Sequence, residues 1–148
     1  MIKNIIGEIS VLFSYPKYLV VLAVRLVLAY GFLQPTLMKL QNMTQTAEWF
    51  ASLHIPFPTL LAYLVTMFEA MGVAFLILGL FTRYISITLV FVMMGAIFFV
   101  HLPNGFSVAN NGFEIPLYYM LFLSILASGG GGKYALDYLF FGKGVEDE

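Results

Sequence analysis

Four long apolar segments, separated by shorter polar stretches, dominate the pattern of hydrophobic and polar positions along the chain. They cover residues 17–39, 57–81, 84–102 and 113–131. About 20 apolar residues in a helix match the ~30 Å thickness of a bilayer's hydrocarbon core. The apolar part of the fourth segment is slightly short, at about 24 Å, so either the glycines at 129–132 continue the helix or the bilayer thins there. We predict an all-α integral membrane fold, a bundle of four transmembrane helices.

Three shorter segments have the pattern of amphipathic helices. Residues 1–15 place apolar side chains at helical spacing, the 40–56 connection contains a similar segment with Trp49, and residues 133–141 form a third. Each is too short to span a bilayer, so we expect short interfacial helices in the plane of the membrane surface. Tryptophan is common at that depth. Residues 142–148 are polar and are predicted to form a disordered tail.

A secretory signal peptide is the alternative interpretation of residues 1–15, because Lys3 precedes several apolar residues. Signal peptides, however, have an uninterrupted apolar region followed by a cleavage site of small residues. This segment alternates apolar with polar residues and has no such site. We therefore expect it to be retained as an interfacial helix.

The basic residues are distributed unequally between the two sides of the predicted bundle. Five of them fall on one side and one on the other; they are Lys3, Lys17, Arg83, Lys133 and Lys143 against Lys39. Lysine and arginine are retained on the cytoplasmic side of membrane proteins. We therefore expect a protein of the cytoplasmic (inner) membrane, with both termini in the cytoplasm and the polar connections 40–56 and 103–113 facing outward.

The composition is that of a membrane protein rather than of a soluble domain. Of 148 residues, 61% are hydrophobic and only 10% are charged, whereas about a quarter are charged in soluble domains. We interpret residues 1–148 as one membrane domain. A net charge of -1 without a basic patch argues against nucleic-acid binding. The absence of cysteine excludes thiol chemistry and iron–sulfur clusters, so we expect no intrinsic cofactor, and a redox role would need a bound ligand or partner.

Charged residues inside the predicted spans are candidates for function. Arg25 lies in the first span, Glu69 in the second, and Glu114 opens the fourth. An unpaired charge in the bilayer costs several kcal/mol. Counted by helical rise, Arg25 lies about 11 Å and Glu69 about 14 Å from the inner boundary, which predicts that these two residues form an ion pair. The pair could fix only the register of the helices, or it could also bind a ligand or carry a proton.

A second group of polar residues flanks the outward loop. Lys39 ends the first span on that side, His101 ends the third and Glu114 opens the fourth. With Glu69 deeper along the path, these side chains could form a mouth that hydrogen-bonds a quinone-like head group. A capping role is the alternative for Glu114, because a carboxylate is favoured at a helix N-terminus. His54 and His101 could ligate a metal or haem, but two histidines of unfixed geometry are weak grounds, and we expect no metal site. Further candidates are Tyr30, Tyr63 and Tyr118.

Several motifs resemble the DoxX family of small four-helix membrane proteins, which is named for quinone-linked oxidoreductase subunits. The similar features are Arg25 and Lys39 around the first helix, FEAMGVAFLILGLFTR at 68–83, NNGFEIPLYY at 110–119 and GGGKYALD at 130–137. They occur in the family's order over nearly the whole chain. Two features depart from the general pattern: Thr36 stands where the family tends to have glycine, and Pro35 resembles a subgroup feature. The resemblance implies a redox-associated membrane protein.

Three functions fit this sequence. The first is a redox-linked subunit that binds a quinone or a similar lipid-soluble molecule in a polar intramembrane pocket. The second is a small-molecule transporter or binding module, in which Arg25 and Glu69 line a path for a solute or a proton. The third is a membrane anchor that recruits oxidoreductase partners through its interfacial helices. The expected partners are the lipid bilayer, such a ligand, and an oxidoreductase or a second copy of the chain.

Overall fold

A computed structural model describes residues 2–14 and 16–142, and its described elements are all helical. This confirms the predicted all-α class. Residues 1, 15 and 143–148 lie outside the described residues, and with them all of the predicted tail except Gly142. The elements are α1 (Ile2–Ser14), α2 (Lys17–Gln41), α3 (Met43–Ser52), α4 (Pro58–Leu78), α5 (Thr82–Ala96), a π-helical turn η1 (Ile97–His101), two 3-10 turns η2 (Leu102–Asn104) and η3 (Val108–Asn110), α6 (Glu114–Gly129) and α7 (Leu136–Phe141).

Three helical stretches of the described chain are long and apolar enough to cross a membrane. They are α2, α4 and the continuous stretch Thr82–Asn104, with mean hydropathies of 1.7, 2.1 and 2.4. The fourth apolar helix, α6, is shorter and has 16 residues. Of the two alternatives for this segment, continuation through the glycines is wrong. The helix ends at Gly129 because Gly130 turns to a φ of 76°.

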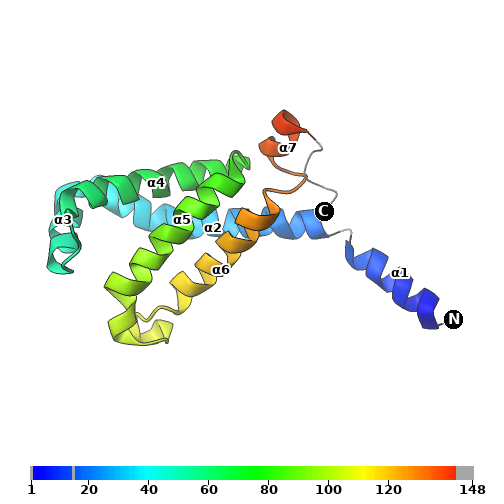
Figure 1. Cartoon of the computed structure of the whole chain (residues 1–148), viewed down its shortest axis with the longest axis horizontal. Helices are drawn as coiled ribbons and strands as arrows, with labels where there is room; N and C mark the ends of the chain where they lie inside the picture. Colours follow the sequence, from blue (N-terminus) through cyan, green and yellow to red (C-terminus); the bar gives the residue numbers. More distant parts are fainter. Residues whose placement is uncertain (1, 15, 143–148) are drawn as a thin grey trace.

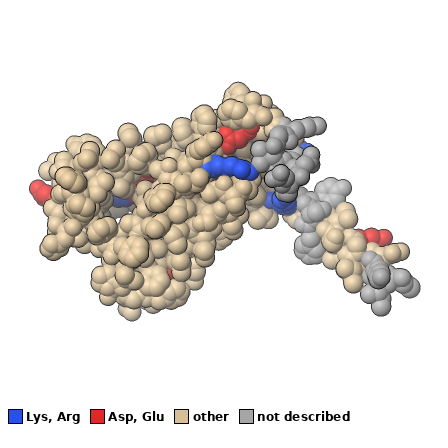
Figure 2. Space-filling view, viewed as in Figure 1, with Lys and Arg blue, Asp and Glu red and all other residues tan. Residues whose placement is uncertain are grey.

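The apolar helices pack as two crossing antiparallel pairs (Figure 1). Helix α2 lies along α4, and α5 lies along α6; α5 also contacts α4, and α6 contacts α2. The core lies where the four helices meet. Its fully buried leucines are Leu28, Leu76, Leu89, Leu123 and Leu126. Many other large apolar side chains are exposed, and the face in Figure 2 carries few charged atoms, as a surface in contact with lipid requires.

The shorter helices surround this core. Helix α1 stands away from the bundle in Figure 1, with Ile5, Ile6, Ile9 and Val11 exposed on it. Helix α3 packs against α4 and matches the predicted segment in the 40–56 connection. Helix α7 is shorter than the predicted 133–141, because the chain before it is extended at Ala135, whose φ is -121° and ψ 149°.

The connection between α4 and α5 differs from the one expected at residues 82–83, between the predicted spans 57–81 and 84–102. Thr82 is instead the first residue of α5. The turn is made by Gly79, with a φ of 69°, and the N–H groups of Gly79 and Leu80 both donate to the Phe75 carbonyl. A glycine in the left-handed conformation is a common way to end a helix. The break therefore comes about three residues earlier than the polar residues suggested.

Candidate functional site

The central feature of the site is an ion pair between α2 and α4. Lys39 Nζ donates to both oxygens of Glu69, at 2.7 Å to Oε1 and 2.6 Å to Oε2. The Glu69 side chain is 4% exposed and that of Lys39 17%. Lysine can reach along its helix because its four-carbon stem tolerates apolar surroundings while the ammonium seeks a polar group. The pair thus places two opposite charges within the membrane-spanning part of the bundle.

Two buried threonines lie next to this pair, and the sequence analysis did not identify either as a site residue. Thr36 Oγ1 donates to the Phe32 carbonyl at 2.7 Å and lies 3.4 Å from Glu69 Oε2. The shorter contact is the hydrogen bond that the hydroxyl makes. Thr66 lies three residues before Glu69 on the same face of α4. It is 1% exposed, and its hydroxyl has no hydrogen-bond partner among the described residues. The sequence could have indicated Thr66 as a site residue, because it lies one helical turn from a glutamate in an apolar span.

The predicted ion pair between Arg25 and Glu69 is wrong. Arg25 Nη2 donates instead to the Tyr134 carbonyl at 2.6 Å, and Nη1 lies against Gly79, where a side chain would collide with it. Gly79 follows Glu69 by ten residues, about 15 Å of helical rise. The prediction assumed that α2 and α4 reach the same inner boundary. In the structure α2 extends beyond the end of α4, so Arg25 lies level with that end, and Lys39 reaches Glu69 in its place.

Arg25 belongs to a different group of contacts, which we call the inner junction and define as Arg25, Gly79, Tyr134 and Asp137. The Asp137 carboxylate accepts hydrogen bonds from the backbone N–H groups of Phe81 at 2.6 Å and Thr82 at 2.8 Å. The Asp137 N–H donates to the Gly79 carbonyl at 2.9 Å. These bonds fasten the first turn of α7 to the turn between α4 and α5. The described contacts of Arg25 are therefore with this junction and not with Glu69.

His101 and Glu114 organise the loop between α5 and α6. His101 Nδ1 lies 2.8 Å from the Asn111 carbonyl. Glu114 Oε2 accepts from the Val108 N–H at 2.9 Å, and Oε1 accepts from the Tyr118 hydroxyl at 3.1 Å. Within the described chain, these hydrogen bonds stay in the loop and the first turn of α6. The structure therefore joins Lys39 with Glu69 by hydrogen bonds but does not join His101 or Glu114 to that pair.

The π-helical turn η1, which ends at His101, was not predicted. The sequence suggested a regular helix over 84–102, whereas the α-helical part ends at Ala96. Pro103 lies directly after this region. Proline has no N–H and its ring crowds the carbonyl four residues earlier, which is the sequence signal for an irregular end. Single π turns are frequent at functional sites.

These features define a small helical integral membrane protein with a buried ion pair between two spanning helices. The chain belongs to the DoxX family, whose sequence model matches residues 20–102. The match covers α2 to α5 and therefore includes Lys39, Glu69 and the inner junction's Arg25 and Gly79. No solved structure matches the chain.

Three relatives in two bacteria are similar to this chain. A protein of Haemophilus influenzae without an assigned function is 32% identical over 126 residues, which are 80% of this chain and 81% of that protein. A second Haemophilus influenzae protein, also without an assigned function, is 43% identical over 79 residues, 51% of this chain and 58% of that protein. A Bacillus subtilis protein named "Putative oxidoreductase CatD" is 32% identical over 124 residues, 82% of this chain and 88% of that protein.

Proposed function

We propose that this protein is a redox-associated subunit of the cytoplasmic membrane that binds a quinone or a similar lipid-soluble small molecule at the Lys39–Glu69 pair. The observation that carries the proposal is the burial of this pair between two apolar helices. Intramembrane ionisable residues commonly mark ligand and proton pathways. The name of the Bacillus subtilis relative supports the association with redox chemistry.

The chemistry of the pair suits a ligand with a carbonyl oxygen. An ammonium group has three donors, and the hydrogen bonds that the Lys39 ammonium donates to described residues go to Glu69 alone. A donor of Lys39 is therefore left for a carbonyl, and the nearby Thr66 hydroxyl is a second polar group without a partner. The carboxylate of Glu69, beside the same ammonium, is a group that could accept a proton from the ligand. In this proposal the chain binds and orients the head group, and a partner oxidoreductase supplies the electrons.

Photolabelling tests the proposal. The wild-type protein in lipid nanodiscs is illuminated with an azido-substituted ubiquinone analogue, and the labelled peptides are identified by mass spectrometry. We expect labelled peptides from α2 and α4, and an excess of ubiquinone without the azide should reduce their labelling. The double variant Lys39→Met, Glu69→Gln removes both charges together, so neither is stranded, and it should lose at least about nine tenths of the labelling. Lys133→Met, far from the pair along the chain, is the control. Equal labelling of the double variant and the wild type would contradict the proposal.

A membrane anchor that recruits an oxidoreductase is the second candidate function, and the placement of α1 favours it. This helix stands apart from the bundle (Figure 1) and exposes several isoleucines. Deletion of residues 1–14 distinguishes the two functions. If the deletion abolishes co-purification of a partner while the Lys39→Met, Glu69→Gln double variant retains both the partner and the redox activity of the membrane, recruitment is the better account.

A further inference from the structure

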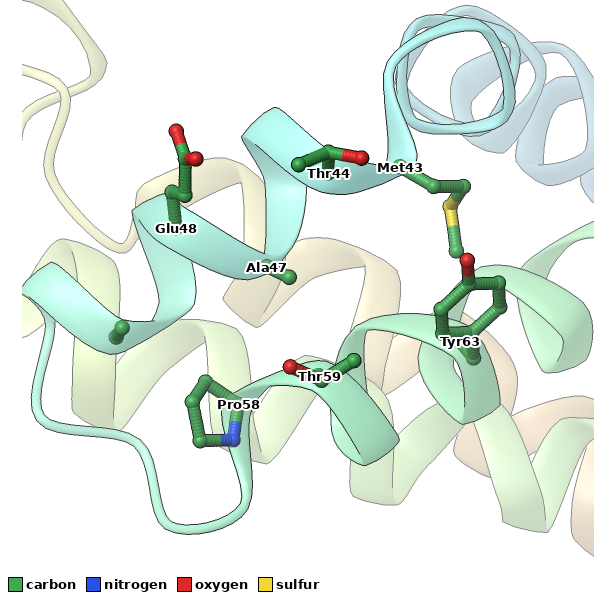
Figure 3. A pocket seen from close by; sticks show the side chains of 8 residues that line it. Met43, Thr44, Ala47, Glu48, Pro58, Thr59 and Tyr63 are labelled. Carbon is green, nitrogen blue, oxygen red and sulfur yellow. The ribbon is translucent and has the colours of Figure 1, made fainter.

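A groove runs between α3 and the first turns of α4, on the side of the bundle where α2 ends. It has a volume of about 270 Å³. One wall is formed by α3 with Ala47 and Ala51, and the other by α4 with Pro58 and Thr59. Figure 3 shows that the side chains of Ala47 and Thr59 point into the groove. The carboxylate of Glu48, the charged residue of the lining, points away from it. The interior of the groove is therefore predominantly apolar.

The size of the groove indicates what it can hold. Pockets that enclose a whole small molecule have about 300–1,000 Å³, and this groove is smaller and open along one side. It is therefore suited to one part of a ligand. An apolar chain fits its walls, because the side chains of Ala47 and Ala51 are small; the hydroxyls of the lining belong to Thr44, Thr59 and Tyr63.

The end of the groove at Met43 and Tyr63 is the one nearer to the Lys39–Glu69 pair along the two helices. Met43 and Tyr63 line this end and approach each other in Figure 3. On the α3 side, Met43 follows Asn42, whose N–H donates to the Lys39 carbonyl at 3.2 Å. On the α4 side, Tyr63 lies six residues before Glu69, about 9 Å of helical rise. Neither member of the pair lines the groove, so a ligand that occupied the groove and contacted the pair would have to extend past Met43 and Tyr63.

A buried polar group lies between the groove and the pair. Thr66 follows Tyr63 by three residues and precedes Glu69 by three, so these residues occupy successive turns of α4. The Thr66 hydroxyl is buried and has no partner among the described residues. A buried hydroxyl without a partner is costly, and a polar ligand atom that reached this height would supply one. The polar groups are thus at Thr66 and the pair, and the apolar surface is in the groove.

We propose that this α3–α4 groove holds the apolar tail of the ligand whose head group binds at Lys39. The ligand class is an amphiphile with a carbonyl-type acceptor in its head and an extended hydrocarbon or isoprenoid chain. This inference rests on the proposed function and adds the tail to it. It also assigns Ala47 and Thr59 as the residues that set the preference for long-chain over tail-less ligands.

The test compares two probes on the full-length protein in detergent micelles. They are decylubiquinone and the same benzoquinone ring without the decyl chain. Binding is followed through the fluorescence of Trp49, the single tryptophan of the chain, which lies in α3 and is quenched by a nearby quinone. Partition of each probe into the micelle is the same for all variants and cancels when variants are compared.

Ala47→Phe fills the groove, and it should weaken decylubiquinone binding by about tenfold while changing the affinity of the tail-less probe by less than about twofold. Thr59→Leu narrows the other wall and should act in the same direction. Gln45→Phe is the matched control, because residues two apart on a helix do not share a face; it should change neither affinity. Each variant must elute as a single species.

Two results would overturn the inference while leaving the proposed function intact. One is that both groove variants bind decylubiquinone as the wild type does. The other is that they weaken both probes equally, which would assign the groove to the head group. If the wild type binds neither probe, the proposed quinone binding fails and the tail site fails with it.

Discussion

Lys39 and Glu69 are opposite charges in an apolar bundle, and each neutralises the other at hydrogen-bonding distance. Both carboxylate oxygens of Glu69 accept from the same ammonium, and Thr36 adds a hydroxyl within 3.4 Å. Desolvation of two charges usually offsets most of the attraction between them. The net stabilisation by the pair is therefore small, but the loss of one partner is expensive. Such a pair fixes the register of α2 against α4.

The first prediction follows from this asymmetry. Glu69→Gln leaves the Lys39 ammonium without its counter-ion and should lower the free energy of unfolding by about 3 kcal/mol, the lower part of the range for broken buried pairs. The Lys39→Met, Glu69→Gln double variant should recover more than half of this loss. Unfolding of the purified protein in mixed micelles, followed by circular dichroism, provides the measurement. Single losses that simply add in the double variant would show that the two residues are not coupled.

Asp137 acts at the scale of helices, because it caps α5 from a segment that lies 55 residues later in the chain. Its carboxylate accepts from the N–H groups of Phe81 and Thr82, which the first turn of a helix otherwise leaves without partners. An anion is also favoured there by the helix dipole. The segment 130–137 thereby holds the turn between two spanning helices in place.

The second prediction concerns this cap. Asp137→Ala removes both acceptors and should destabilise the protein by about 1–2 kcal/mol, as the loss of other N-terminal caps does. Hydrogen exchange should become faster at the amides of Phe81 and Thr82. Asp137→Asn keeps one acceptor and should have a smaller effect. Unchanged exchange at these two amides in the alanine variant would rule out the capping role.

The contact between α2 and α6 depends on a glycine. A Cβ at Gly31 would collide with the Tyr119 hydroxyl, and the Tyr119 ring packs 5.7 Å from that of Phe32. Small residues allow membrane helices to approach closely. Gly95 on α5 offers a matched comparison, because nothing lies within 4 Å of a Cβ placed there.

The third prediction uses this contrast. Gly31→Ala should destabilise the bundle by about 1–3 kcal/mol through overpacking. Gly95→Ala should be neutral or stabilising by up to about 1 kcal/mol, because alanine favours a helix more than glycine does. Thermal unfolding of the two variants in the same detergent measures the difference. Equal melting temperatures would mean that α6 can shift away from α2 without cost.

The helices were predictable because apolar length identifies membrane spans, and α2, α4 and α6 match the predicted spans within a few residues. The pairing of charges was not. It depends on how far α2 extends beyond α4, and a count of residues from assumed boundaries cannot supply this offset. The sequence-based prediction therefore paired Arg25 with Glu69 instead of with the Tyr134 carbonyl. The distant contacts of Asp137 with Phe81 and Thr82 likewise leave no local pattern in the sequence. The apolar groove was missed because alanines on an interfacial helix have no distinctive signature.

At the scale of the whole molecule, the polar contacts lie at different heights in the bundle. The inner junction joins the beginning of α5 to the first turn of α7. Lys17 and Arg83 lie in the first turns of α2 and α5, and Lys133 lies in the connection between α6 and α7. The Lys39–Glu69 pair lies further along α2, toward α3 and the groove. Because positively charged residues are retained on the cytoplasmic side, the sequence predicts an inner junction at the cytoplasm and a groove that opens to the outer leaflet.

The last prediction tests this orientation, which also decides from which leaflet a ligand enters. The chain has no cysteine, so Asn4→Cys in α1 and Val108→Cys in the loop before α6 each introduce a single thiol. Both positions are exposed, and each should react with a maleimide once the membrane is opened. With a membrane-impermeant maleimide on intact spheroplasts, Val108→Cys should be labelled and Asn4→Cys should not, because the basic residues near α1 keep it in the cytoplasm. Labelling of both from outside would place α1 across the membrane from its expected side. The reverse pattern would invert the bundle, and the α3–α4 groove would then open to the inner leaflet.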